Sequence, residues 1–186
     1  ENIFREIDLF LIGEDKERRK ESIIASKINK LNLIKTPRNT KCRDSYFHMN
    51  FENLKNYFVK NIKKYDLVLS PLIEGGHQDH DTVTAALLKS KVSNKSNTKI
   101  LLYSTYRSVS MFPILFRCGI PRGLFTNQRY FFNFTFKGLK RFTQTIFIAY
   151  KSQYISWFLL TPFLFIAYLF GELNYMVIAD ELSLET

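Results

Sequence analysis

The residues best suited to chemistry stand in one short stretch, His77-Gln78-Asp79-His80, which holds two of the three histidines in this chain of 186 residues. A divalent metal takes neutral imidazole and carboxylate ligands that lie close to one another. His77 and His80 on one tight turn could reach the same small volume, and Asp79 could accept the far N–H of one imidazole and fix its tautomer. The stretch therefore predicts half of a metal-dependent active site. The alternative is a solvated turn with chance histidines.

A loop and its two neighbouring elements must hold this stretch in place. Gly75 and Gly76 precede it, and without a Cβ they let the backbone turn sharply and leave room for a substrate. The apolar run upstream predicts a strand at 67–69, and the pattern at 83–88 predicts a small amphipathic helix. Open α/β sheets bind ligands beyond the carboxyl ends of their strands, so the loop at 74–81 is expected to carry the site.

Two further strands are predicted from short apolar runs, at 7–12 and at 100–103. A polar turn at 93–97 precedes the second of these strands. Residues 33–50 show no clear period and contain Pro37, so they are expected to form a loop.

Helices are predicted between these strands, because apolar side chains there recur every three or four residues. One helix follows Asp15, a second follows Asn50 as its N-cap, and a third runs from 137 to 153. Their expected packing faces are Ile24, Ile28 and Leu31; Phe51, Leu54, Phe58 and Ile62; and Phe142, Ile146, Ala149 and Gln153. Alternating strands and helices predict an α/β fold, Rossmann-like, with a mostly parallel sheet and helices on both faces, in a single domain over 1–186.

The charge of the chain is strongly positive, with a net value of +10. It favours acidic partners such as phosphorylated substrates or anionic lipids, although lysines that decorate a surface would give the same value. A basic nucleic-acid-binding protein is a rival class suggested by charge alone. No binding motif supports it, and no nucleic-acid partner is expected. Cys42 and Cys118 show no metal or redox spacing, so a reducing compartment such as the cytoplasm is predicted.

The most apolar stretch, 155–170, has sixteen residues without a charge and contains Pro162. It is slightly short for a membrane-spanning helix. Two interpretations stay open, a buried helix pair in the core or a segment that makes peripheral contact with a membrane.

Candidate substrate-binding residues come from the second half of the chain. Arg107 is one of several arginines that could hold the phosphate of a lipid- or nucleotide-linked sugar, or could be an ordinary surface residue. Tyr150 and Gln153 stand late in a predicted helix, where they could contact a substrate at a pocket mouth or simply pack and cap the helix.

Four motifs in a fixed order resemble the LmbE/PIG-L superfamily of zinc-dependent N-acetylglucosaminyl deacetylases. The strand at 67–69 followed by His-x-Asp-His at 77–80 is one of them. The other three are Gly13-Glu14 followed by Arg18, Glu21 and Ala25; Lys140 followed by Tyr150-Lys151-Ser152-Gln153; and Gly171-Glu172. The resemblance extends over nearly the whole chain, and the order and spacing of the motifs carry it more than any one of them.

The resemblance implies an activity and assigns roles. It implies hydrolytic removal of the acetyl group from an N-acetylglucosamine-type sugar or glycoconjugate. His80 would be a zinc ligand, His77 would act at the carbonyl or the leaving amine, and Asp79 would orient a histidine. Zinc would polarise the acetamide carbonyl and lower the pKa of its bound water.

One motif of the family has no counterpart in this sequence. The family's His-Pro-Asp-Asp-Glu, which supplies the other zinc ligands and the general base, precedes the strand that matches 7–12. The chain is therefore expected to lack its first βα unit and to be inactive alone. His48, the third histidine, stands in a predicted loop and is a poor candidate ligand. The alternative function is a catalytically incomplete member that binds a glycan or a partner.

Overall fold

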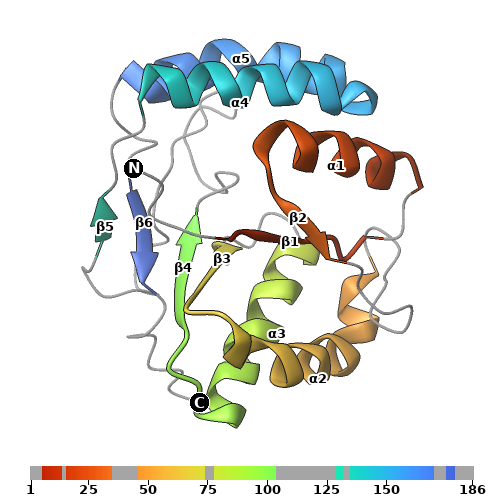
Figure 1. Ribbon diagram of the computed structural model, residues 1–186, viewed down its shortest axis with the longest axis vertical. Coiled ribbons are helices and arrows are strands. Elements are labelled where there is room, and N and C mark those ends of the chain that lie inside the picture. Colours follow the sequence, from red (N-terminus) through yellow and green to blue (C-terminus); the bar gives the residue numbers. More distant parts are fainter. Residues whose placement is uncertain are drawn as a thin grey trace. The chain divides into compact units, whose positions relative to one another are not determined.

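The computed structural model of the chain describes residues 6–13, 16–34, 46–73, 78–103, 129–131, 135–169 and 175–178 (Figure 1). It mixes helices with short strands, as an α/β fold does. The chain divides into two compact units, each built from two stretches. Unit 1 comprises Glu1–Asp44 and Thr135–Pro162, and unit 2 comprises Ser45–Phe134 and Phe163–Thr186. The single domain expected over 1–186 stays a prediction.

Unit 1 begins with a strand, a helix and a second strand. Strand β1 (Asp8–Phe10) leads into helix α1 (Lys16–Asn29), and β2 (Asn32–Ile34) pairs parallel to β1. Lys30 has a φ of 56°, the left-handed conformation that often ends a helix. The strand predicted at 7–12 is confirmed as β1. The loop predicted at 33–50 is wrong where β2 occupies it, because a strand of three residues is too short to show an alternating pattern.

Helix α1 packs against α4 (Phe136–Ala149). The helix predicted over 137–153 is confirmed as α4 followed by the 3₁₀ turn η4 (Lys151–Gln153). The packing face predicted for α1 is wrong, since Ile24 is 42% exposed. Small and polar residues are buried in its place, namely Glu21, Ser22, Ala25 and Ser26. A hydrophobic period cannot detect such a face, because two of its polar groups are satisfied by hydrogen bonds, Glu21 by Ser152 and the Ser26 hydroxyl by the Ile23 carbonyl of the same helix.

Unit 2 contains a helical pair next to a sheet. The short η2 (Phe47–Asn50) leads into α2 (Phe51–Asn61) and η3 (Ile62–Lys64). Strand β3 (Leu67–Pro71), helix α3 (Gln78–Asn94) and strand β4 (Lys99–Tyr103) follow. Strands β3 and β4 run parallel, with Leu67 opposite Lys99. The strands predicted at 67–69 and 100–103 and the helix at 83–88 are confirmed. The turn predicted at 93–97 is confirmed from 95 onward, whereas Ser93 and Asn94 still belong to α3.

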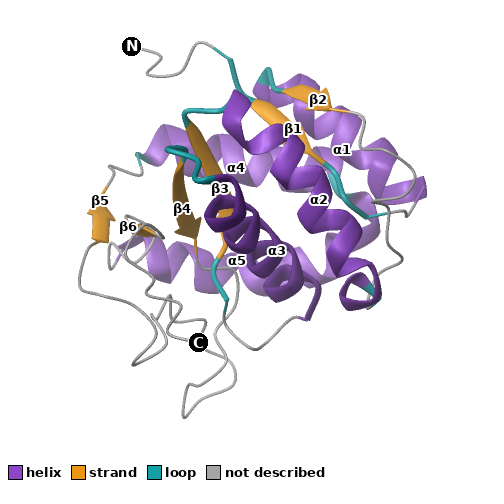
Figure 2. Cartoon of the chain, turned by 90° about the horizontal axis from the view of Figure 1, so that it is seen from below, coloured by secondary structure: helices purple, strands orange, loops and turns teal. Residues whose placement is uncertain are grey.

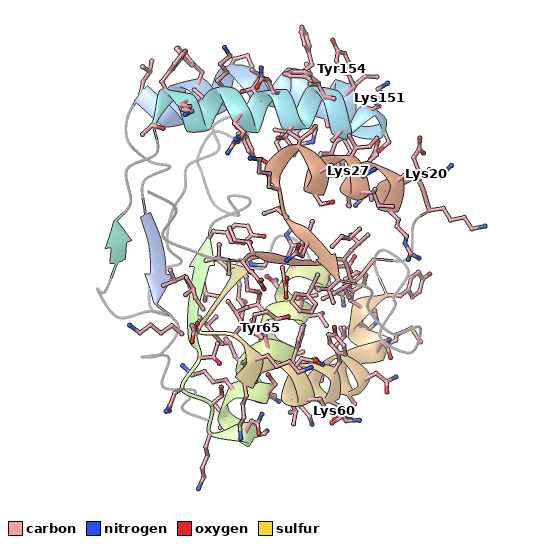
Figure 3. All side chains as sticks on the ribbon, in the orientation of Figure 1. Lys20, Lys27, Lys60, Tyr65, Lys151 and Tyr154 are labelled. Carbon is pink, nitrogen blue, oxygen red and sulfur yellow. The ribbon has the colours of Figure 1, made fainter. Side chains whose placement is uncertain are left out.

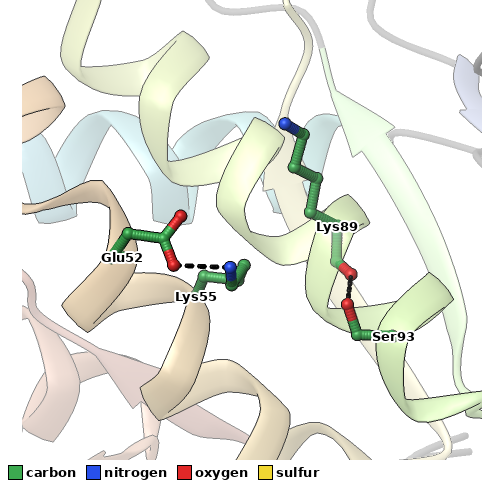
Figure 4. A network of polar contacts seen from close by, with 4 residues as sticks. All are labelled: Glu52, Lys55, Lys89 and Ser93. Carbon is green, nitrogen blue, oxygen red and sulfur yellow. Dashed lines mark hydrogen bonds and ion pairs between the residues drawn. The ribbon is translucent and has the colours of Figure 1, made fainter. Parts of the chain in front are cut away.

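Helices α2 and α3 lie side by side (Figure 2). The face predicted for α2 is confirmed, with Leu54, Phe58 and Ile62 buried. The Lys89 ammonium of α3 lies 5.5 Å from the centre of the Phe51 ring of α2. Within α3, the Ser93 hydroxyl donates a hydrogen bond to the Lys89 carbonyl at 2.8 Å (Figure 4). Asn50 is the N-cap of α2, as predicted, although its side chain accepts a hydrogen bond from the Asn53 side chain and makes no capping bond to the helix backbone.

The sheet of unit 2 is mixed. Its order is β3-β4-β6-β5, and β6 (Tyr175–Ile178) runs antiparallel to both β4 and β5 (Arg129–Phe131), as Figure 1 shows. The parallel pairing that the sequence predicts is confirmed for β1–β2 and β3–β4, but not for the rest of the sheet. The three middle residues of β4 are buried, which makes it a central strand of this sheet.

The apolar stretch at 155–170 forms helix α5 (Tyr154–Leu169), which continues through Pro162. Proline lacks an N–H, so the carbonyl four residues earlier receives no helix bond from this position. Among the described residues, none of the helices combines the length and the apolarity that crossing a membrane requires.

Candidate functional site

The junction between β3 and α3 is fixed by two buried hydroxyls. Thr84 Oγ1 donates to the Pro71 carbonyl at 2.7 Å and lies 2.7 Å from Ser70 Oγ. Because a hydroxyl has one proton, Ser70 must be the donor to Thr84. The backbone N–H of Leu72 donates to the Tyr103 carbonyl at 2.8 Å, which extends the β3–β4 pairing beyond Pro71. The carboxyl end of β3 is thereby tied to both α3 and β4.

The first turn of α3 carries the histidine motif. Residues 78–81, expected in a loop, are helical, so the prediction is wrong for that part of 74–81. Asp79 is only 4% exposed, and its Oδ1 accepts a hydrogen bond from the backbone N–H of Phe47 at 3.3 Å. Two acidic side chains in this turn, Asp79 and Asp81, also interact favourably with the positive, N-terminal end of the helix dipole.

His80 is partly buried beside Asp79. Neighbouring residues on an α-helix point roughly 100° apart. Asp79 and His80 are thus presented in different directions, and Asp79 is directed at η2. The structure supports a role for Asp79 in fixing the start of α3, whereas its predicted role in orienting an imidazole stays a prediction.

A shallow hollow of about 320 Å³ opens on the η2 side of α3. His48 from η2 and Asp81 from α3 both line it, together with Phe51, Ile73, Thr82 and Ala85. The sequence alone predicts a loop at His48 and makes it a poor candidate ligand. No local pattern connects it to Asp81, because the packing of η2 on α3 brings them to one surface.

The metal expected at the motif requires several protein ligands close together. Within the ranges that the structure describes, no three His, Cys, Asp or Glu side chains lie together in a way that could hold a metal ion. His80 can supply one ligand there, and zinc needs three or four from the protein. His77 and Arg107 lie outside the described residues, so no geometry applies to them.

A second candidate place lies in unit 1. Tyr150 and Gln153, both predicted to bind substrate, line one cavity of about 320 Å³. Trp157 Nε1 donates to Gln153 Oε1 at 3.1 Å, and the Trp157 ring meets Phe142 edge-on at 6.1 Å. The other lining residues are Leu9, Ala25, Asn29, Leu31, Thr145 and Ile146. An apolar wall with a few polar groups is the usual composition of a small-molecule pocket.

One buried carboxylate joins two of the motifs in unit 1. Glu21 Oε1 accepts the backbone N–H of Ser152 at 2.6 Å, and Oε2 accepts the Ser152 hydroxyl at 2.8 Å. Glu21 is 5% exposed, whereas Ser152 is exposed, so the bonds join a buried carboxylate to a surface turn. They fix η4, and with it Tyr150 and Gln153, against α1.

The structure therefore gathers the predicted residues in two groups. Asp79 and His80 stand on the first turn of α3 in unit 2, and Tyr150 and Gln153 line a cavity of unit 1. Lys140, also part of the resemblance, is exposed on α4.

No protein-family model matches the sequence, and no curated protein matches it significantly. Two solved structures are similar in fold. A "deacetylase-bog complex in biosynthesis pathway of teicoplanin" has 14% identity and a TM-score of 0.56, over 89% of this chain and 74% of that chain. A deacetylase triple mutant of the teicoplanin biosynthetic pathway has 15% identity and a TM-score of 0.53, over 88% of this chain and 71% of that chain. At this identity, the likeness shows a fold shared with deacetylases.

Proposed function

We propose that this chain belongs to a metal-dependent hydrolase that removes the acetyl group from an N-acetylglucosamine-type sugar or glycoconjugate, on a Rossmann-like scaffold. One observation carries the proposal. Asp79 and His80 open the helix that follows the carboxyl end of β3, in a chain whose fold is that of known deacetylases. This edge of a sheet is where open α/β folds bind their ligands.

Each predicted residue has a role in this proposal. His80 binds the metal, for which zinc is the first candidate, and His77 acts at the acetamide carbonyl or the leaving amine. When bound, zinc supplies a polarised carbonyl and a water of lowered pKa. Arg107, Tyr150 and Gln153 contact the sugar or its carrier. Because the described residues hold no complete ligand set, the remaining ligands and the general base must come from elsewhere in the protein.

A second candidate function is a catalytically incomplete member that binds a glycan. The cavity of unit 1 favours it, because aromatic and amide side chains line this cavity without any need for a metal. Aromatic faces with a nearby amide suit a sugar ring.

Zinc content and acetate release decide between the two functions. Both are measured for this chain and for the full-length product of its gene, with N-acetylglucosamine conjugates as substrates. We expect the full-length protein to bind about one zinc ion and to release acetate, and His80→Ala to abolish both. His48→Ala is the matched control and should retain both. A full-length protein with neither metal nor activity that still binds the conjugate would establish the glycan-binding function instead.

A further inference from the structure

Helix α5 exposes a row of large apolar side chains. Ile155, Phe158 and Leu159 are 75%, 61% and 63% exposed, and the spacing of three and four residues places them on one side of the helix. Trp157 and Thr161 are only partly exposed and form the inner side. Contiguous exposed apolar side chains of this kind mark an interaction surface.

The outer side of the neighbouring helix is basic. Lys137, Lys140 and Arg141 are exposed on α4, and Lys151 is exposed on η4. The stretch 136–169 contains these four basic residues and no acidic residue. A surface with one sign of charge selects partners of the opposite sign.

The two helices that carry these side chains lie side by side, because the Phe142 ring of α4 meets the Trp157 ring of α5 edge-on at 6.1 Å. The Tyr154 ring lies 5.5 Å from Phe147 of α4 and 6.3 Å from Phe158 of α5. Tyr154 is 50% exposed, and Figure 3 draws it beside Lys151 at this end of the helices. The α4–α5 face, defined as Lys137, Lys140, Arg141, Lys151, Tyr154, Ile155, Phe158 and Leu159, therefore combines apolar and cationic side chains.

We propose that the α4–α5 face binds the surface of a membrane that contains anionic lipids. An interfacial helix inserts its apolar side at the boundary between head groups and acyl chains, while lysines and arginines contact the anionic head groups. With sixteen residues, α5 is about 24 Å long. The hydrocarbon core is roughly 30 Å thick, so this helix lies along the membrane rather than across it.

The charge of the face also argues against a second copy of the chain as its occupant. A twofold contact through this face would bring two sets of four cations together with no acidic residue from 136–169 to neutralise them. Nucleic acid would match the cations but would leave the exposed isoleucine, phenylalanine and leucine in water. The proposal does not depend on the proposed function, because neither His80 nor the cavity of unit 1 takes part in it.

Vesicle co-sedimentation of the whole chain tests the proposal, with phosphatidylcholine vesicles that contain or lack phosphatidylserine. We expect binding that requires phosphatidylserine and weakens with salt. Both Phe158→Glu/Leu159→Glu and Lys140→Glu/Arg141→Glu should lower the partition coefficient by about tenfold or more. The matched controls are Val92→Glu, an exposed apolar residue of α3, and Lys60→Glu/Lys63→Glu, exposed cations of unit 2. Both controls should bind nearly as the parent chain does.

Three outcomes would overturn the proposal. The first is a parent chain that does not bind vesicles with phosphatidylserine. The second is an equal loss of binding in the controls, which would indicate a general charge effect. The third is a parent chain that binds no vesicles but self-associates in sedimentation velocity, with Phe158→Glu/Leu159→Glu abolishing the self-association. A second copy of the chain would then cover the face. Circular dichroism checks folding, and if the apolar variant unfolds, the Lys140→Glu/Arg141→Glu variant decides.

Discussion

The carboxylate of Glu21 receives both the backbone N–H and the hydroxyl of Ser152, two residues far apart in the sequence. Both oxygens are used, and Glu21 is 5% exposed. A buried carboxylate is stable only when hydrogen bonds replace its hydration. This pair therefore connects α1 with the turn that carries Tyr150 and Gln153.

Glu21→Ala should lower the free energy of unfolding by roughly 2–4 kcal/mol, because it leaves the Ser152 N–H without its charged acceptor and removes a buried side chain. Glu21→Gln keeps an acceptor and should recover part of the loss. Urea denaturation measures both changes. Glu17→Ala, at an exposed position of the same helix, should cost less than about 0.5 kcal/mol. An equal effect at both positions would show that Glu21 contributes only helix propensity.

Thr84→Val should destabilise the chain by roughly 1–3 kcal/mol, because it removes the donor to the Pro71 carbonyl and the acceptor for Ser70. The double variant with Ser70→Ala should cost less than the sum of the single variants, since both act on one network. Thermal or urea unfolding provides the four values of the cycle. Strict additivity would mean that the two hydroxyls act independently.

Gln153→Met should weaken binding of an N-acetylglucosamine glycoside by about fivefold or more, because it removes a polar group from the cavity and the acceptor for Trp157. Calorimetry or ligand-observed NMR measures the dissociation constant. Gln144→Met, an exposed change on α4, is the matched control. Unchanged affinity in Gln153→Met would remove the cavity of unit 1 from the substrate site.

Burial lowers the pKa of Lys91 below its ordinary value of 10.5. The folded state then binds fewer protons than the unfolded state between the lowered pKa and 10.5, so stability should rise with pH across that window. Lys91→Met should abolish the rise. Burial raises the pKa of Tyr57 above 10.0, which acts in the opposite direction at higher pH. Urea midpoints measured in a Tyr57→Phe background isolate the lysine, and a flat profile there would contradict the prediction.

Local patterns of hydrophobicity are sufficient to predict several of the elements. The apolar period of α2 predicts its buried face, and short apolar runs predict β3 and β4. These features depend on side chains close together in the sequence, so periodicity records them. The order of the motifs also predicts a deacetylase-like fold, which the structural likeness supports.

The sequence by itself determined which residues alternate in hydrophobicity and which residue types could bind a metal or a sugar. The tertiary structure decided the antiparallel place of β6, the burial of Glu21 and the shared hollow of His48 and Asp81. Each of these depends on segments distant in sequence that meet only after folding. Contacts between such segments produce no periodic pattern in the sequence of either segment. The reason is that burial of a polar group becomes favourable only when its hydrogen-bond partner is in place.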